Sequence, residues 1–369
     1  QPVVEPTPLA VVLAAVGFVA LLGVCGLAIF SLNPLGYDVL VAAAVSAVLA
    51  WLLFRIRRQA RPTASPTRCQ AWFRKTVGLG RGVVIALLAS WLGLIGWARL
   101  SPAGTPPPPK TNPEAIRVVT WNIHCGQESG PFWKRFDWAG RKTPLRIAID
   151  QAAPDILCVQ EAVAEQVAFL EQALPSHQRV GVGRDDGDKG GEYCAIYCRR
   201  DRFEMLGSGT FWLEEPTDRA VATSPFNPRR ICTWARLRDL QSGRLVRVYN
   251  THLYLTEGAR QTAARVILAQ IAAGDPTDAV ILTGDFNTTP GAPTWNLFTA
   301  AGLTDSAKLA GQRTGAPTYH FYGIPLRCID GVLVRGPWQV RAHRVLDVKP
   351  ENVFPSDHFG ILTDLVLRD

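Results

Sequence analysis

Two polar residues follow an apolar run in "VILTGDFNTTPGAPTW", residues 280–295. Asp285 and Asn287 are two positions apart, so an extended chain would put both side chains on one side and Phe286 on the other. A carboxylate and a carboxamide that point the same way could hold a water molecule, a metal ion or a phosphate oxygen. They could equally cap the next helix, so this pair alone does not define a function.

The same kinds of residue stand at the ends of other strand-like segments. These residues are Asn122 in "VVTWNIH", Glu161 in "PDILCVQE", His252 in "VYNTHL", Asp330 in "CIDGVLV", and Asp357 and His358 in "PSDHFG". Polar groups at strand ends converge over one edge of a sheet, where ligands bind. A single such residue is more often a helix cap or a loop hydrogen bond. Eight acids, amides and imidazoles together predict a catalytic or metal-binding site.

Strand-like and helix-like segments alternate from Ile116 to the end of the chain. Period-two and buried apolar runs predict strands over 116–123, 154–161, 190–200, 231–239, 244–253, 280–287, 328–334 and 360–367. Helical periodicity covers 144–152, 162–174 and 261–272. This mixture predicts an α/β sandwich of two sheets with helices on the outside.

The N-terminal part of the chain contains three long apolar stretches, over residues 8–32, 35–54 and 82–98. Each is near the roughly 20 residues that cross a bilayer, and together they predict a membrane region over residues 1–100. Buried core helices are the alternative. The basic loop between the second and third stretches should stay in the cytoplasm of a bacterium. The third stretch then places the following domain on the periplasmic or extracellular side; if it does not span, the domain stays inside.

A proline-rich segment, residues 101–114, separates this region from a domain over 115–369 and predicts a semi-rigid spacer. The net charge of +8 is uneven, because residues 1–109 contribute +7 and residues 110–369 only +1. The basic composition therefore gives no sign of a nucleic-acid groove in the domain, and it weakens nucleic acid as a substrate without excluding it. The domain's six cysteines lack zinc-site spacing, and we consider a disulfide between Cys194 or Cys198 and Cys232.

Six motifs, taken in order, resemble the endonuclease/exonuclease/phosphatase superfamily, which includes pancreatic deoxyribonuclease. They are "VVTWNIH", "PDILCVQE", "YNTHL", "LTGDFNTTP", "CIDGVLV" and "PSDHFG", and the resemblance covers about residues 115–369. It implies a four-layered α/β sandwich, in which two central mixed sheets are flanked by helices, and hydrolysis of phosphate esters. The apolar N-terminal stretches lie outside the resemblance.

The resemblance also implies a role for each polar residue. A divalent cation, Mg²⁺ or Mn²⁺, would neutralise the phosphoryl oxygens, because hard cations prefer oxygen ligands. Glu161 would be its primary ligand, and Asn122 and Asp357 would complete or support the metal site. Asp285 would orient and deprotonate the attacking water, while Asn287 would hold that water or a phosphate oxygen.

Two histidines complete the predicted site. His358 would pair with Asp330, because a carboxylate fixes the tautomer of an imidazole and favours its cationic form, which could bind the scissile phosphate. His252 would hydrogen-bond the phosphate or assist the leaving group. The sequence leaves open which histidine is the acid and which the base.

Some positions depart from the family pattern or permit two interpretations. His124 stands where abasic-site endonucleases carry a metal-binding acid, so we expect it to line the site, and abasic-site repair is disfavoured. Arg229 and Arg230 could bind substrate or simply begin a solvated strand. The "DWAGRK" and "GRDDGDKGG" loops are expected to shape the substrate pocket.

The sequence therefore predicts a membrane-anchored, metal-dependent phosphodiesterase with nuclease-like activity. The alternative is a phosphatase or phospholipase C-type hydrolase that acts on lipid or small-molecule phosphate esters. A catalytically silent binding domain ranks third, because none of the eight polar residues is missing.

Overall fold

The computed structural model of this chain describes residues 104–110, 112–126, 137–220, 228–321 and 323–368. The three predicted membrane spans lie outside these ranges. Within the described ranges, no helix is both long and apolar enough to cross a membrane.

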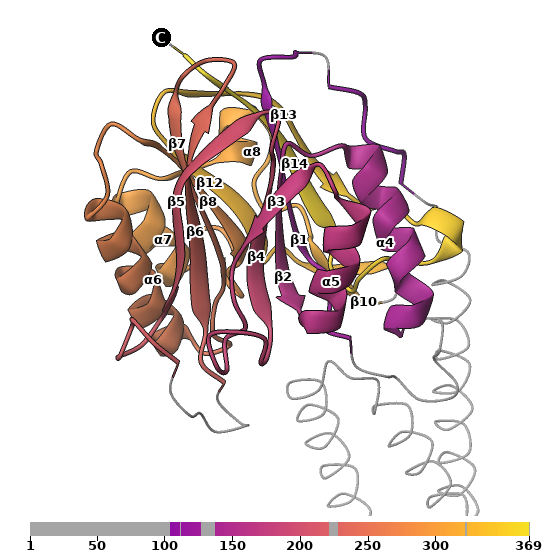
Figure 1. The fold of residues 1–369 in the computed structure, drawn as a ribbon, viewed down its shortest axis with the longest axis horizontal. Helices are drawn as coiled ribbons and strands as arrows, with labels where there is room; N and C mark the ends of the chain where they lie inside the picture. The colour runs from indigo at the N-terminus through magenta and orange to yellow at the C-terminus, as the bar shows by residue number, and fades with distance from the viewer. Residues whose placement is uncertain (1–103, 111, 127–136, 221–227, 322, 369) are drawn as a thin grey trace, which may run out of the picture. The chain divides into compact units, whose positions relative to one another are not determined.

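Two six-stranded sheets face each other (Figure 1). The first sheet has the order β13 (Trp338–Leu346), β14 (Gly360–Leu367), β1 (Ile116–Asn122), β2 (Ile156–Ala162), β4 (Tyr193–Arg199) and β3 (His177–Val180). The second has the order β5 (Phe203–Trp212), β6 (Ile231–Asp239), β7 (Leu245–His252), β8 (Ala279–Asp285), β12 (Asp330–Arg335) and β9 (Thr304–Asp305). Both sheets are mixed, because β1 is parallel to β2 and β7 is parallel to β8, whereas the other named pairs are antiparallel.

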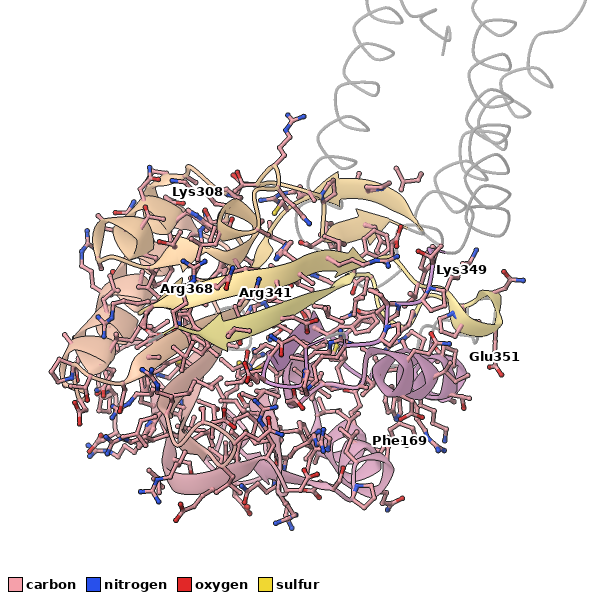
Figure 2. The ribbon with its side chains drawn as sticks, turned by 90° about the horizontal axis from the view of Figure 1, so that it is seen from above. Phe169, Lys308, Arg341, Lys349, Glu351 and Arg368 are labelled. Carbon is pink, nitrogen blue, oxygen red and sulfur yellow. The ribbon has the colours of Figure 1, made fainter. Side chains whose placement is uncertain are left out.

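Helices cover the outer faces of the two sheets. Helices α4 (Trp138–Ala152) and α5 (Ala164–Ala173) lie against the first sheet, and α6 (Glu257–Ala272) and α7 (Pro293–Ala300) lie against the second (Figure 1). The remaining elements are the short helix α8 (Ser306–Leu309), the hairpin β10 (Tyr319–Phe321) and β11 (Ile324–Arg327), and the 3-10 turn η1 (Pro350–Asn352). Lys349 and Glu351 mark that turn in Figure 2. The four-layered α/β sandwich predicted from the sequence is confirmed.

Strand β1 shows why the central strands are apolar on both faces. Alternate side chains point to opposite sides of a strand, so Ile116 and Val118 pack between the sheets, whereas Val119 and Trp121 pack under the helices. All seven residues of β1 are buried. This packing holds the end of the strand, and therefore Asn122, in a fixed position.

Some boundaries differ from the sequence prediction. Helix α4 begins at Trp138 and contains Pro144, which we had placed at a helix start. The "DWAGRK" segment is thus mainly the first turn of this helix. The strands β5 and β13 were not predicted, because β5 contains two glycines and β13 contains two arginines and a histidine. The considered disulfide is not formed, since all six described cysteines are free thiols.

Candidate active site

The predicted residues meet at one edge of the sandwich because of the strand registers. In the second sheet, His252 and Asp330 each pair with Asp285, on either side of it. In the first sheet, Asn122 ends β1, and the neighbouring strand β2 has an irregular register between Val159 and Ala162. Glu161 lies within that irregularity with a left-handed φ of 62°. Backbones of this kind cluster at functional sites, where they re-aim a side chain.

Asn122 links the two sheets across the site. Its Nδ2 donates to Oε1 of Glu161 at 2.9 Å and to Oδ2 of Asp285 at 3.0 Å, and lies 3.5 Å from Nε2 of His358. Its Oδ1 accepts a hydrogen bond from the backbone N–H of His124 at 3.0 Å. The completely buried amide therefore holds Glu161 and Asp285 at a fixed separation.

His358 is held by Asp330. Its Nδ1 lies 2.9 Å from Oδ2 of Asp330, and its Nε2 lies 3.8 Å from Oδ2 of Asp285. Burial alone would lower the pKa of His358, but the charge and hydrogen bond of Asp330 outweigh it and hold the pKa well above the usual value. His358 is thus a buried cation beside Asp285.

His252 has the opposite character. Burial and the charge of Arg230 hold the pKa of His252 well below its usual value. Its Nε2 lies 3.5 Å from Oδ2 of Asp285, and its Nδ1 lies 2.9 Å from Nη1 of Arg230. A neutral imidazole and an imidazolium therefore face the same carboxylate from two sides.

Asp285 is buried at the centre of these contacts, with 2% of its surface exposed. Burial and the negative charge of Asp330 raise the pKa of Asp285 to about 7. A group with a pKa near neutrality is suited to take a proton at neutral pH. Asn287 donates its backbone N–H to Oδ1 of Asp285 at 2.9 Å and its Nδ2 to the carbonyl of Leu253 at 3.0 Å. Its φ of 50° departs from an extended chain, so the predicted alternation does not place its side chain.

Glu161 has the properties of a metal ligand. Burial opposes its ionisation, but contacts with His124 and the hydrogen bond from Asn122 hold the pKa of Glu161 well below its usual value. His124 lies between two acids, with Nδ1 3.6 Å from Oε2 of Glu161 and 3.5 Å from Oδ1 of Asp357. Burial opposes the ionisation of Asp357 as well, and the charge of His124 outweighs it, so the pKa of Asp357 is lowered. Ionised carboxylates such as these offer the oxygen ligands that Mg²⁺ and Mn²⁺ prefer.

Three overlapping groups of side chains could hold a metal ion in the described part of the chain. They are His124, Cys125 and Glu161; Glu161, His252 and Asp285; and Asp285, Asp330 and His358. Glu161 and Asp285 each belong to two of these groups. Asn122 and Asp357, the other predicted ligands, contact members of these groups.

Three residues of the site were not assigned a role there from the sequence. Glu192 follows the "GRDDGDKGG" loop and lies 3.8 Å from Nδ1 of His252. Arg230 was considered only as a substrate contact or a strand start. Arg141, buried in α4, donates to the carbonyl oxygens of Ile123, His124, Cys125 and Pro355 at 2.7–3.3 Å. No sequence signal marked Arg141, because these four partners are backbone atoms.

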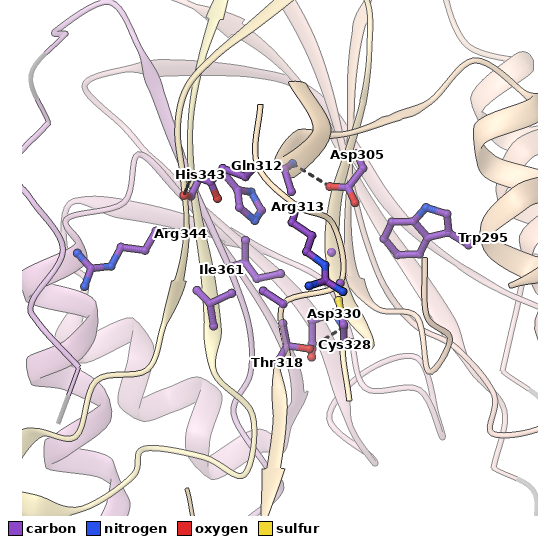
Figure 3. Close-up of a pocket in the computed structure, with 15 residues that line it drawn as sticks. Trp295, Asp305, Gln312, Arg313, Thr318, Cys328, Asp330, His343, Arg344 and Ile361 are labelled. Atoms are coloured by element: carbon purple, nitrogen blue, oxygen red, sulfur yellow. Dashed lines mark hydrogen bonds between the residues drawn. The ribbon is translucent and has the colours of Figure 1, made fainter. Parts of the chain in front are cut away.

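Asp330 also borders a cavity of about 390 Å³ (Figure 3). Trp295, Asp305, Arg313 and Cys328 line this cavity, whereas none of the other seven predicted site residues does. Oδ1 of Asp330 is buried and has no hydrogen-bond partner among the described residues. The two oxygens of Asp330 therefore have different surroundings, since only Oδ2 holds His358.

Comparison with known proteins agrees with this geometry. The model of the Endonuclease/Exonuclease/phosphatase family matches residues 119–358. An endonuclease/exonuclease/phosphatase from Bacteroides vulgatus is 31% identical, with a TM-score of 0.62 and coverage of 69% of this chain and 99% of that one. The Bacteroides thetaiotaomicron protein "mannosyl-6-phosphatase Bt3783" is 26% identical, with a TM-score of 0.61 and coverage of 68% and 100%. Nocturnin of Drosophila melanogaster is 28% identical over a 199-residue alignment that covers 48% of this chain and 29% of Nocturnin.

Proposed function

Because the chain belongs to the endonuclease/exonuclease/phosphatase family, we propose that it is a divalent-metal-dependent hydrolase of phosphate esters. The observation that carries this proposal is the convergence of both sheets on Asp285. Asn122 and the two imidazoles, one neutral and one cationic, all lie within 3.8 Å of its Oδ2. A catalytically silent domain would have no need to hold so many ionisable groups in buried contact.

The chemistry follows from these residues. Glu161 would hold the metal, with Asn122 and Asp357 in support, and the bound cation would neutralise charge on the phosphoryl oxygens. Asp285, whose pKa of about 7 suits proton transfer, would orient the attacking water and take its proton. His358, kept cationic by Asp330, would stabilise negative charge on the phosphoryl group, as a preorganised charge does.

The loops beside His252 favour a small substrate over nucleic acid. The loop over residues 181–192 contains four acids and two bases, and the loop over 213–219 contains three acids and one base. Like charges repel a polyanion more than a small phosphate ester. The similarity to a protein named as a mannosyl-6-phosphatase supports the same choice. We therefore place phosphate esters of small molecules first and the nuclease-like activity expected from the sequence second.

The test is a comparison of substrates with the purified full chain in Mg²⁺ and in EDTA. The substrates are p-nitrophenyl phosphate, bis-p-nitrophenyl phosphate, hexose 6-phosphates and supercoiled plasmid. We expect metal-dependent phosphate release from the monoesters and little plasmid nicking. Efficient nicking without monoester hydrolysis would reverse the order of substrates. A folded protein that hydrolyses none of these compounds would refute the proposed activity.

Membrane attachment remains a separate proposal, because the apolar stretches lie outside the described residues. Their length and the basic loop between them support a membrane anchor with the domain on the periplasmic or extracellular side. Extraction of cell membranes with alkaline carbonate tests the anchor, and external protease tests the side. Release of the chain by carbonate would contradict the anchor, and protection of the domain in spheroplasts would contradict the orientation.

A further inference from the structure

The side of His252 that faces away from Asp285 is in contact with an arginine. Nη1 of Arg230 lies 2.9 Å from Nδ1 of His252, and both side chains are buried. A guanidinium has N–H donors and no acceptor, and it keeps its charge in proteins. Nδ1 of His252 must therefore accept this hydrogen bond, which leaves the single ring proton on Nε2.

Arg230 is itself fixed by its surroundings. Its Nη1 is 3.4 Å from Oε2 of Glu192, and its backbone N–H donates to the hydroxyl of Tyr254 at 3.2 Å. Glu192 is held in turn by both terminal nitrogens of Arg184, at 2.5 and 2.9 Å. The carbonyl of Arg184 accepts a hydrogen bond from Nε1 of Trp212 at 2.8 Å. The guanidinium thus has a defined place rather than the freedom of a surface arginine.

We propose that Arg230 is a positioning residue that fixes the tautomer of His252. With the proton on Nε2, the imidazole presents an N–H group toward Oδ2 of Asp285, 3.5 Å away, and toward the phosphoryl oxygen that occupies the reaction centre. In this tautomer His252 donates a hydrogen bond and does not act as the base that removes a proton from water. The functional meaning of this inference rests on the proposed phosphoesterase activity, whereas the tautomer itself does not.

Without Arg230, Glu192 would become the hydrogen-bond partner of Nδ1 of His252. Oε2 of Glu192 lies 3.8 Å from Nδ1 of His252, slightly nearer than Oε1 of Glu161 at 4.0 Å, so it can accept a hydrogen bond from a proton on that nitrogen. If the guanidinium is removed, Nδ1–H can pair with Glu192, and Nε2 becomes an acceptor. Two acceptors, Nε2 and the carboxylate of Asp285, would then face each other across the reaction centre. The substitution should therefore move the proton and weaken catalysis together.

The direct test is the tautomer of His252, measured by long-range ¹H–¹⁵N NMR correlations on the full chain in EDTA. A His252→Gln variant assigns the signal among the six histidines. We expect the parent to carry the proton on Nε2, Arg230→Lys to keep it there, and Arg230→Met to move it to Nδ1. A parent protonated on Nδ1, or an Arg230→Met variant with the parent's tautomer, would overturn the proposal. If a variant does not fold, the parent spectrum alone still decides whether His252 carries its proton on Nε2.

Kinetic measurements separate the positioning role of Arg230 from the proposed phosphoesterase activity. Arg230→Met should lower kcat on the order of 100-fold, the range of a lost proton donor, with a smaller change in KM, and Arg230→Lys should restore part of the loss. A lower kcat with an unchanged tautomer would refute the positioning role while the phosphoesterase assignment stands. If the parent hydrolyses no phosphate ester, the assignment fails, and the NMR result still decides the tautomer.

Discussion

Replacing Asp330 by asparagine removes one charge from the site while keeping its shape. Oδ2 of Asp330 is 2.9 Å from Nδ1 of His358, and the asparagine oxygen can accept the same hydrogen bond. The new NH₂ group would replace Oδ1, which lacks a partner among the described residues and belongs to a residue that borders a cavity of about 390 Å³. The hydrogen bond is kept but the buried His358 cation loses its charged partner, so the free energy of unfolding should fall by about 3 kcal/mol, the lower end of the range for a broken buried pair.

The same electrostatic interaction sets the catalytic effect. Opposite charges about 4 Å apart attract by about 4 kcal/mol at an effective dielectric constant of about 20. The amide hydrogen bond retains about 1 kcal/mol of this interaction. If the cation of His358 stabilises the transition state, the remaining loss of about 3 kcal/mol corresponds to a decrease in kcat on the order of 100-fold.

The assay is phosphate release in Mg²⁺ for the parent and Asp330→Asn, with urea unfolding of both. Asp305→Asn is the matched control, because Asp305 lines the same cavity and its carboxylate accepts a hydrogen bond from the backbone N–H of Ala307 rather than from a predicted site residue. Asparagine can also keep the cap that Asp305 forms on α8. A folded Asp330→Asn enzyme with the kcat of the parent would refute the role of the charge. An equal loss in Asp305→Asn would show that the cavity, rather than His358, is responsible.

Three further predictions concern stability and support of the site. Asp364→Asn breaks a buried two-point pair with Arg117, at 2.7 and 2.8 Å, and should lower the free energy of unfolding by about 3–5 kcal/mol in urea titrations; an unchanged midpoint would contradict this. Hydrogen bonds to Glu257, first of all from Arg260 one turn along α6, lower the pKa of its carboxyl group to about 2. The stability that the ionised carboxylate contributes is therefore present above the usual pKa of glutamate and is lost as the pH falls toward 2. Glu257→Gln should thus be less stable than the parent at neutral pH but not at pH 2, and a difference that persists in acid would exclude this linkage. Arg141→Met removes donors to four backbone carbonyls and should raise the Mg²⁺ concentration for half-maximal activity, whereas the exposed Arg146→Met should not; equal effects would show that the support is not specific.

The sequence predicts which residues share the site where those residues lie at the ends of strands. Asn122, Glu161, His252 and Asp285 each lie at the last or next-to-last position of a strand, so the sheet registers place Asn122 near Glu161 and His252 beside Asp285. The pairing of His358 with Asp330 was likewise expected, and Nδ1 of His358 lies 2.9 Å from Oδ2 of Asp330. Local sequence patterns succeed here because the strands are rigid and their ends share one edge.

The contacts that tune the site could not be predicted in this way. Arg230 and Glu192 meet at His252 from two different loops, and 38 positions separate them in the chain. Their meeting depends on how the two sheets pack, which no local pattern encodes. The extended geometry expected for Asn287 fails for a simpler reason, because the chain leaves the strand at Asp285 and turns. The neutral state of His252 follows from its burial and from the charge of Arg230 rather than from its own segment.

Metal-dependent hydrolysis of phosphate esters is tested most directly by measuring how phosphate release depends on Mg²⁺ in the full chain and in its Glu161→Gln variant. The neighbouring Glu165→Gln is the control, because Glu165 lies on the exposed side of α5. We predict hydrolysis of p-nitrophenyl phosphate that rises with Mg²⁺, stops in EDTA and is retained by Glu165→Gln. Glu161→Gln should fold and be inactive or require far more metal. Hydrolysis that persists in EDTA, or a Glu161→Gln variant with the metal dependence of the parent, would contradict the account.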